Sequence, residues 1–197
     1  MRSACRDRLR VPLHEPTTGT TTRGRARLVD VTEPASTDAV STHLGRLAGT
    51  WHGTNGFRMM PTDEFHDAPA TATLTTAAGG QAVVVTYTWV HPDDGPQEGV
   101  LLLGSPDEHN AITAAWVDCW HQHPSVLMLS GTAADGRVEV TADYGGGWQW
   151  TVAVEGDAPL RLTMLNVVPP EQATDEVAAG PYPVMVAELH RTPESER

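Results

Sequence analysis

The stretch QAVVVTYTWVHPDDGPQEGVLLLG, residues 81–104, predicts a β-hairpin. From Val83 to Trp89, large apolar side chains alternate with smaller or polar ones, a period of two that is typical of a strand with one buried face. PDDGP, residues 92–96, then supplies the proline, aspartate and glycine that favour a turn. A second apolar run follows, so the two halves are expected to pair, with Thr86 and Thr88 facing solvent.

The same pattern repeats outward from this hairpin in both directions. Short runs rich in Val, Leu, Thr and Trp alternate with links rich in Gly, Pro and Asp, at the spacing of roughly 8–12 residues that marks an all-β sandwich or barrel. The expected strands cover residues 50–57, 70–77, 81–91, 98–104, 111–121, 125–131, 137–143, 148–154, 160–168 and 183–191. Short links favour an antiparallel up-and-down β-barrel, because closure removes exposed strand edges. A barrel of about ten strands is wide enough for an internal cavity.

The first part of the chain lacks this pattern. Residues 1–35 are rich in Arg, Thr, Gly and Pro and show neither strand nor helix periodicity, so we predict a disordered tail or, alternatively, sequence upstream of the true start. From residue 36, Val40, Leu44 and Leu47 follow a helical spacing, which predicts a short helix before the first strand. The predicted domain therefore covers residues 36–197.

Charge is distributed unevenly and excludes some classes of partner. Residues 1–46 carry eight Arg and five acidic residues (+3), and residues 47–197 carry five Arg and twenty acidic residues (−15), which together give the net charge of −12. Such an acidic domain repels phosphate backbones, so no nucleic-acid partner is expected. The chain has no lysine, which excludes Schiff-base and P-loop lysine chemistry.

Three features favour a cytoplasmic protein. No apolar run approaches the roughly 18 residues that a membrane-spanning helix needs, so no membrane partner is expected. The first residues, MRSACRDRLRVPLHEP, lack the apolar segment of a secretion signal. The two cysteines, Cys5 and Cys119, are not expected to form a bridge, and reduced thiols fit the cytosol.

The segment AITAAWVDCWHQHPS, residues 111–125, is the densest cluster of chemically capable side chains. Strand alternation places Trp116, Asp118 and Trp120 on one face, and Cys119 and His121 on the other. If the first face points inward, Asp118 needs a donor: an indole N–H, a ring nitrogen, an Arg or a trapped water. Two interpretations stay open: the wall of a mostly apolar binding pocket, or ordinary core with Asp118 paired to an Arg.

Other rows and segments add to this picture. Trp89 and Trp150 lie in further rows of alternating side chains. Another such row consists of Val184, Val186, Glu188 and His190. The chain has six Trp against two Phe, which favours an interior of hydrogen-bonding aromatic rings over a dry core.

Two loop features have alternative interpretations. His121 and His123 share a face and could hold a metal, but no third ligand is adjacent and no metal site is expected. Met59, Met60 and Phe65 in residues 58–67 are either a flexible apolar lid or a simple cap.

The segment LAGTWHG, residues 47–53, resembles the Gly-x-Trp signature that opens the first strand of calycins, the lipocalin and fatty-acid-binding-protein group. Residues 44–191 are similar to an uncharacterised bacterial family of calycin-like barrels, which shares an opening Gly-Thr-Trp, a central Trp-x-Asp strand, a glycine after the next strand and a closing strand that ends in a basic residue. Here these elements are at residues 49–51, 116–118, 131 and 190–191. The resemblance implies a barrel and a cavity, and no established activity.

A more distant resemblance concerns nitrobindin-type haem barrels, which also open with Gly-Thr-Trp-x-Gly. Those proteins place a haem-ligating histidine on the last strand, where His190 stands in this chain. The segment TNGFRMMPTDEF, residues 54–65, replaces their glycine-rich continuation. The resemblance implies haem as one possible cofactor, ligated by His190, and the departure at residues 54–65 argues against it.

Together these observations predict a cytoplasmic β-barrel, monomeric or homodimeric, that binds a small apolar or aromatic molecule and catalyses no reaction. The expected ligand-binding residues are Trp51, Trp89, Trp116, Asp118, Trp120, Trp150 and His190. One alternative is a haem barrel ligated by His190. A second is an enzyme in which Asp118 and a histidine (His52, His91 or His190) act as acid and base. A third is a purely structural or partner-binding role, with the lumen filled by side chains.

Overall fold

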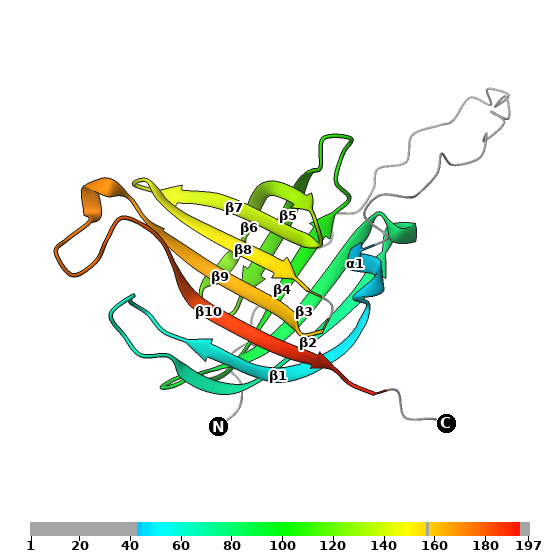
Figure 1. Ribbon diagram of the computed structural model, residues 1–197, viewed down its shortest axis with the longest axis horizontal. Coiled ribbons are helices and arrows are strands. Elements are labelled where there is room, and N and C mark those ends of the chain that lie inside the picture. The colour runs from blue at the N-terminus through cyan, green and yellow to red at the C-terminus, as the bar shows by residue number, and fades with distance from the viewer. Residues whose placement is uncertain (1–42, 157, 194–197) are drawn as a thin grey trace, which may run out of the picture. The chain divides into compact units, whose positions relative to one another are not determined.

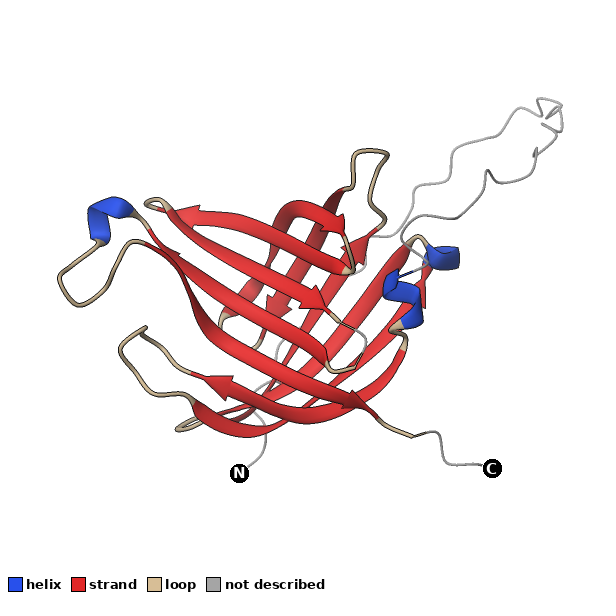
Figure 2. Ribbon diagram, viewed as in Figure 1, coloured by secondary structure: helices blue, strands red, loops and turns tan. Residues whose placement is uncertain are grey.

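The computed structural model describes residues 43–156 and 158–193, which form a closed barrel of antiparallel strands (Figures 1 and 2). The strand bounds are β1 Gly49–Phe57, β2 His66–Ala77, β3 Ala82–His91, β4 Gly95–Gly104, β5 Ala111–Asp118, β6 Gln122–Ala134, β7 Arg137–Gly145, β8 Trp148–Glu155, β9 Leu160–Val168 and β10 Gly180–Arg191. Each strand pairs with its neighbour in sequence, and β10 closes the ring against β1. The predicted ten-stranded up-and-down barrel is confirmed.

The short helix α1, His43–Arg46, precedes β1. The predicted helix began at residue 36, and its first part lies outside the described residues, as does the predicted tail of residues 1–35. Two short 3-10 helices, η1 Ala78–Gly80 and η2 Pro170–Gln172, lie in the links after β2 and β9. Across the described residues, no helix combines the length and the apolar character needed to cross a membrane.

The barrel has two different ends (Figure 1). We call the end with α1, η1 and the links after β4, β6 and β8 the helix end. The other, which carries the links after β1, β3, β5, β7 and β9, is called the loop end. Residues 58–65 and the long link of residues 169–179 both lie at the loop end, because β1 and β9 run toward it.

Two irregularities move side chains away from the faces that simple alternation predicts. The register of β5 against β6 shifts between Trp116 and Asp118, and β5 ends at Asp118, three residues before the predicted end. The register of β10 against β9 shifts between Pro183 and Met185. As a result the predicted row that ends at His190 does not line the lumen beyond Val184; Met185, Ala187 and Leu189 are buried instead.

Trp51, near the start of β1 at the helix end, is fully buried. Its indole Nε1–H donates to the carbonyl oxygen of Leu47 at 2.9 Å. The Arg191 guanidinium lies 4.5 Å from the centre of the Trp51 ring and donates to the carbonyl oxygens of Arg46 and Ala48 at 2.7 and 2.6 Å. These contacts connect the end of α1 to the first and last strands and give the Trp51 N–H a partner.

Candidate functional site

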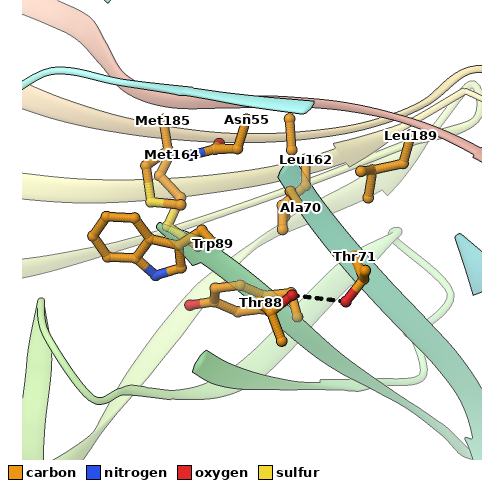
Figure 3. A pocket seen from close by; sticks show the side chains of 11 residues that line it. Asn55, Ala70, Thr71, Thr88, Trp89, Leu162, Met164, Met185 and Leu189 are labelled. Atoms are coloured by element: carbon orange, nitrogen blue, oxygen red, sulfur yellow. Dashed lines mark hydrogen bonds between the residues drawn. The ribbon is translucent and has the colours of Figure 1, made fainter. Parts of the chain in front are cut away.

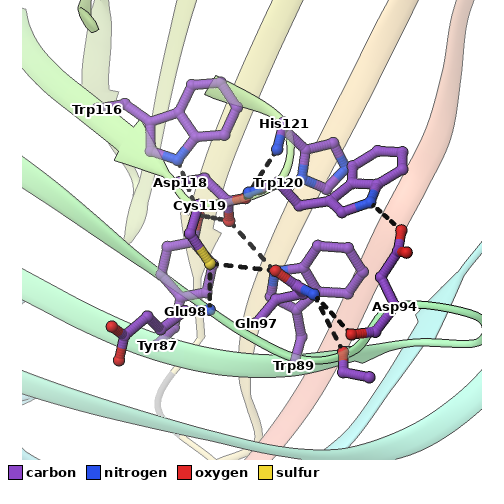
Figure 4. A network of polar contacts seen from close by, with 11 residues as sticks. Tyr87, Trp89, Asp94, Gln97, Glu98, Trp116, Asp118, Cys119, Trp120 and His121 are labelled. Atoms are coloured by element: carbon purple, nitrogen blue, oxygen red, sulfur yellow. Dashed lines mark hydrogen bonds and ion pairs between the residues drawn. The ribbon is translucent and has the colours of Figure 1, made fainter. Parts of the chain in front are cut away.

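Asp118, the last residue of β5, organises the loop end of the lumen (Figure 4). Its side chain is buried, and its Oδ2 accepts hydrogen bonds from Tyr87 Oη at 2.8 Å and from Trp89 Nε1 at 3.2 Å. Its Oδ1 accepts from the backbone N–H groups of Trp120 at 2.8 Å and His121 at 2.9 Å. Of the donors expected for this carboxylate, the structure therefore supplies an indole, together with a tyrosine and backbone groups.

His121 supplies the ring nitrogen that partners Asp118, since His121 Nδ1 lies 3.3 Å from Asp118 Oδ1. Alternation placed His121 on the opposite face, and that prediction is wrong, because β5 ends at Asp118 and the following turn brings the imidazole back inward. Its side chain is only 7% exposed. The signal in the sequence is the aspartate itself. An aspartate carboxylate commonly accepts hydrogen bonds from the backbone N–H groups two and three residues later and so forms a turn.

This contact sets the chemistry of the imidazole. When Nδ1–H donates to the carboxylate, Nε2 carries the lone pair and becomes a hydrogen-bond acceptor. His121 Nε2 is buried and has no hydrogen-bond partner in the structure. A buried acceptor of this kind costs free energy until a donor reaches it.

A second chain of hydrogen bonds supports Asp118 from the other side. Trp116 Nε1 donates to Tyr87 Oη at 2.8 Å, and Tyr87 in turn donates to Asp118. Gly99 on β4 makes room for this phenol, because a Cβ at that position would lie 2.2 Å from Tyr87 Oη. Burial and the nearby charge of Asp118 raise the pKa of Tyr87 well above its usual 10.0, so Tyr87 stays a donor.

The carboxylate itself is held in its charged form. Burial acts to raise the pKa of Asp118, but the hydrogen bond and the charge attraction from His121, with the two backbone N–H groups, outweigh it. The net effect lowers the pKa of Asp118 below its usual 3.8. Asp118 is therefore ionised at neutral pH and fixes the orientation of the side chains around it.

Aromatic rings surround the His121 imidazole. The centres of the Trp89, Trp120 and Trp150 rings lie 5.0, 4.8 and 5.2 Å from its centre. Trp150 stacks on Trp116 at 5.4 Å with an angle of 7° between the ring planes. We call these four indoles, with Phe57, His91 and His121, the aromatic cluster.

Trp120 is the half-buried member of the aromatic cluster and lies in the turn after β5. It stacks on His91 with ring centres 4.6 Å apart and 24° between the planes, and its Nε1 donates to Asp94 Oδ2 at 2.8 Å. His91 Nδ1 accepts from the backbone N–H groups of Asp93 and Asp94 at 3.2 and 3.1 Å. The turn after β3 thus holds both the stacking partner and the hydrogen-bond partner of Trp120.

Two more buried side chains have unpartnered polar atoms. Trp150 Nε1 has no acceptor, and both amide atoms of Asn55 on β1 have no partner. Asn55 lies beside Met164 and Met185 at a small cavity with room for about one water molecule (Figure 3). Asn55 was not predicted from the sequence, because it stands among Gly and Thr residues in a strand without a clear apolar row.

The structure brings five of the seven predicted ligand-binding residues together at the loop end: Trp89, Trp116, Asp118, Trp120 and Trp150. Trp51 lies at the helix end, where its indole is a structural contact. His190 is exposed and lies on the outer face of β10. His52, considered as an acid–base partner of Asp118, is also exposed and contacts Thr192 Oγ1 at 3.1 Å.

The residues do not fit a haem bound through His190. The side chain of His190 points away from the lumen, and the cavity described above is far smaller than a porphyrin. His121 and His123 also fail to converge, since His121 is buried and His123 is exposed. Among residues 43–156 and 158–193, no three His, Cys, Asp or Glu side chains are grouped as a metal site.

The link of residues 58–65 lies at the loop end, where the lid was expected. Met59, Met60 and Phe65 are 48%, 41% and 40% exposed. Arg58 Nε and Nη1 donate to the carbonyl oxygens of Pro183 and Pro61 at 2.9 and 3.0 Å, which ties the base of this link to β10. Its apolar side chains thus stay partly exposed at the loop end.

Comparison with known proteins gives no family: no protein-family model matches the chain, and no curated protein matches its sequence. The resemblance to calycin-like barrels stays a prediction.

Proposed function

We propose that this protein binds a small molecule in the aromatic cluster at the loop end of the barrel. The observation that carries the proposal is the pair of unpartnered atoms, His121 Nε2 and Trp150 Nε1, inside a wall of aromatic rings. Native proteins pair nearly all buried polar groups, and pockets for small molecules combine apolar walls with a few polar groups. An acceptor and a donor that lack partners at one place support a site completed by a ligand.

The ligand enters by displacing a side chain, because the cavity beside Asn55 holds about one water molecule. Trp120 is the ring that moves at the lowest cost. Phe57, Trp89, Trp116 and Trp150 are buried within strands, whereas Trp120 is half-buried and belongs to a turn. Its outward rotation opens a path to His121 from the loop end.

The test uses N-phenyl-1-naphthylamine, a neutral aromatic probe whose fluorescence rises in apolar surroundings. We expect saturable binding of one probe molecule per chain by the wild-type protein. Trp120→Ala should bind the probe more tightly, because no indole has to leave. Trp148→Ala is the matched control: it removes a half-buried indole from the start of β8 at the same end, and the affinity should stay at the wild-type value.

Two outcomes would contradict the proposal. One is no saturable fluorescence change with either the wild-type protein or Trp120→Ala. The other is equal tightening in Trp120→Ala and Trp148→Ala, because this would place the probe outside the aromatic cluster.

A second candidate function, acid–base catalysis, is supported by the Asp118–His121 contact of 3.3 Å, since an oriented imidazole with a free Nε2 is the core of many acid–base sites. Hydrolysis of p-nitrophenyl acetate tests it. Activity above the solvent rate that is lost in His121→Gln and kept in His123→Gln would support catalysis. Equal rates in all three proteins would leave only binding.

A further inference from the structure

The two ends of the barrel differ in charge. Of the five arginines that the structure describes, four lie at the helix end: Arg46, Arg137, Arg161 and Arg191. Arg137 pairs there with Glu139 and Glu155, and Arg161 pairs with Glu188. Among the described residues of the helix end, four arginines therefore stand against six acidic side chains, three of which form these ion pairs.

The loop end carries a rim of exposed acidic side chains with little compensation. They are Asp63, Glu64, Asp67, Asp93, Asp94, Glu98, Asp143, Glu171, Asp175 and Glu176. Arg58, the described arginine at this end, is engaged by backbone carbonyl groups and lies 4.5 Å from the centre of the Phe65 ring. A mouth lined by one sign of charge concentrates ligands of the opposite sign, so the loop end attracts cations.

The interior behind this rim also suits a cation. The faces of Trp, Phe and Tyr rings carry negative electrostatic potential and attract ammonium groups, most strongly for Trp. Four indoles gather around His121, and the ionised Asp118 lies directly behind its imidazole. An anionic ligand would meet both the acidic rim and this buried carboxylate.

Trp120 indicates the shape of the ligand. Its planar ring stacks on His91, and its N–H donates to Asp94 Oδ2. A ligand that replaces this indole therefore finds a ring surface at His91 and a carboxylate for an N–H group at Asp94. His121 Nε2 offers a second acceptor for an N–H donor deeper in the site.

We infer that the ligand is a small aromatic or heteroaromatic amine that is positively charged at neutral pH, with its ring on His91 and its N–H groups on Asp94 and His121. This inference rests on the proposed function and adds the charge and the ring to it. The acidic rim and the indole faces each favour a cation, and the unpartnered acceptor at His121 favours an N–H donor.

Isothermal titration calorimetry with three compounds of similar shape tests the inference: 2-phenylethylamine, 2-phenylethanol and phenylacetate. We expect the amine to bind at least about tenfold more tightly than the alcohol, the size of a partly desolvated cation–π and charge contribution, and phenylacetate to bind most weakly. Raising the salt concentration should weaken amine binding and leave alcohol binding nearly unchanged.

Two variants locate the charge effect. Asp94→Asn should reduce the preference for 2-phenylethylamine over 2-phenylethanol by about three- to tenfold, since it removes the charge and keeps the size. Glu108→Gln removes one exposed charge at the helix end and should change neither affinity.

The outcomes separate this inference from the proposed function. Equal affinities for amine and alcohol, or tightest binding of phenylacetate, would overturn the cationic ligand and leave a binding barrel. Binding of N-phenyl-1-naphthylamine with no binding of the amine would do the same. Failure of all four compounds to bind would overturn both.

Discussion

Trp51 and Trp150 are both buried indoles, at opposite ends of one barrel, and only Trp51 has an acceptor for its N–H. At the helix end the indole, the Arg191 guanidinium and the backbone carbonyl groups satisfy one another. At the loop end, Trp150, His121 and Asn55 keep unpartnered atoms although the carboxylate beside them is fully engaged. Burial of a tryptophan therefore does not identify its role, whereas the presence or absence of an acceptor for its N–H does.

The largest effect on stability should come from removing the buried Trp51 indole at the helix end. Trp51→Ala is expected to lower the free energy of unfolding by about 3–5 kcal/mol, because it deletes a fully buried indole with its hydrogen bond. Trp120→Ala, at a half-buried ring, should lower it by less than about 2 kcal/mol. Urea denaturation measures both, and similar losses would refute the assignment of separate roles to the two ends.

The next effect concerns the carboxylate of the loop end. Asp118→Asn should lower the free energy of unfolding by about 2–3 kcal/mol, since charge-assisted bonds from Tyr87, Trp89 and two backbone groups weaken together. Asp93→Asn, at an exposed position of the same end, should change it by no more than about 0.5 kcal/mol. If Asp118→Asn is as stable as Asp93→Asn, the network does not hold the loop end together.

The contribution of Asp118 should also depend on pH. Its pKa is lower in the folded protein than the usual 3.8, so the folded state binds the proton less readily than the unfolded chain. The stabilisation is therefore complete above that usual pKa and is lost as pH falls through the lower folded value. Urea denaturation of the wild-type protein and Asp118→Asn across this range should show the gap between them closing toward low pH. If the difference in stability instead widens toward low pH, the pKa of Asp118 is not lowered in the folded protein.

A smaller effect is expected from glycine positions that distinguish the ends. Gly99→Ala places a Cβ 2.2 Å from Tyr87 Oη and should lower the free energy of unfolding by about 1–3 kcal/mol through overpacking. Gly45→Ala, in α1, meets Thr76 Cγ2 at 3.9 Å and should be neutral or slightly stabilising. Thermal denaturation compares the two variants, and an unaffected Gly99→Ala would show that Tyr87 has room to move.

The smallest effect is the sharpest comparison of the two indoles. Trp51→Phe loses a hydrogen bond to Leu47 and should cost about 1 kcal/mol more than the ring change alone. Trp150→Phe makes the same ring change but removes a donor that has no acceptor, so the free energy of unfolding should fall by no more than the cost of the ring change alone. It should at the same time weaken ligand binding. A larger loss of stability in Trp150→Phe than in Trp51→Phe would mean that Trp150 Nε1 is satisfied in solution.

Strand alternation in the sequence predicted the barrel and most of the aromatic cluster. It placed Trp89, Trp116 and Trp150 in rows that proved to be buried, because these residues lie within regular strands. It misplaced His121, since β5 ends early and a turn reverses the face. It also grouped His190 on one face with Val184, because a register shift in β10 cannot be seen from the period alone.

The hydrogen-bond partners of Asp118 could not be predicted from the sequence for a different reason. Whether Asp118 meets an indole, an arginine or water depends on contacts between β3, β5 and the turn after β5, which are distant in sequence. Gly-x-Trp similarly identified Trp51 but not its role, since that role depends on Arg191 at the far end of the domain.

The most direct measurement is a high-resolution crystal structure of the protein with 2-phenylethylamine or N-phenyl-1-naphthylamine bound at saturation. We expect the molecule inside the aromatic cluster, within hydrogen-bond or ring-contact distance of His121 and Trp150, and the Trp120 indole moved from His91. A probe that occupies only the outer surface, with Trp120 still stacked on His91, would contradict it.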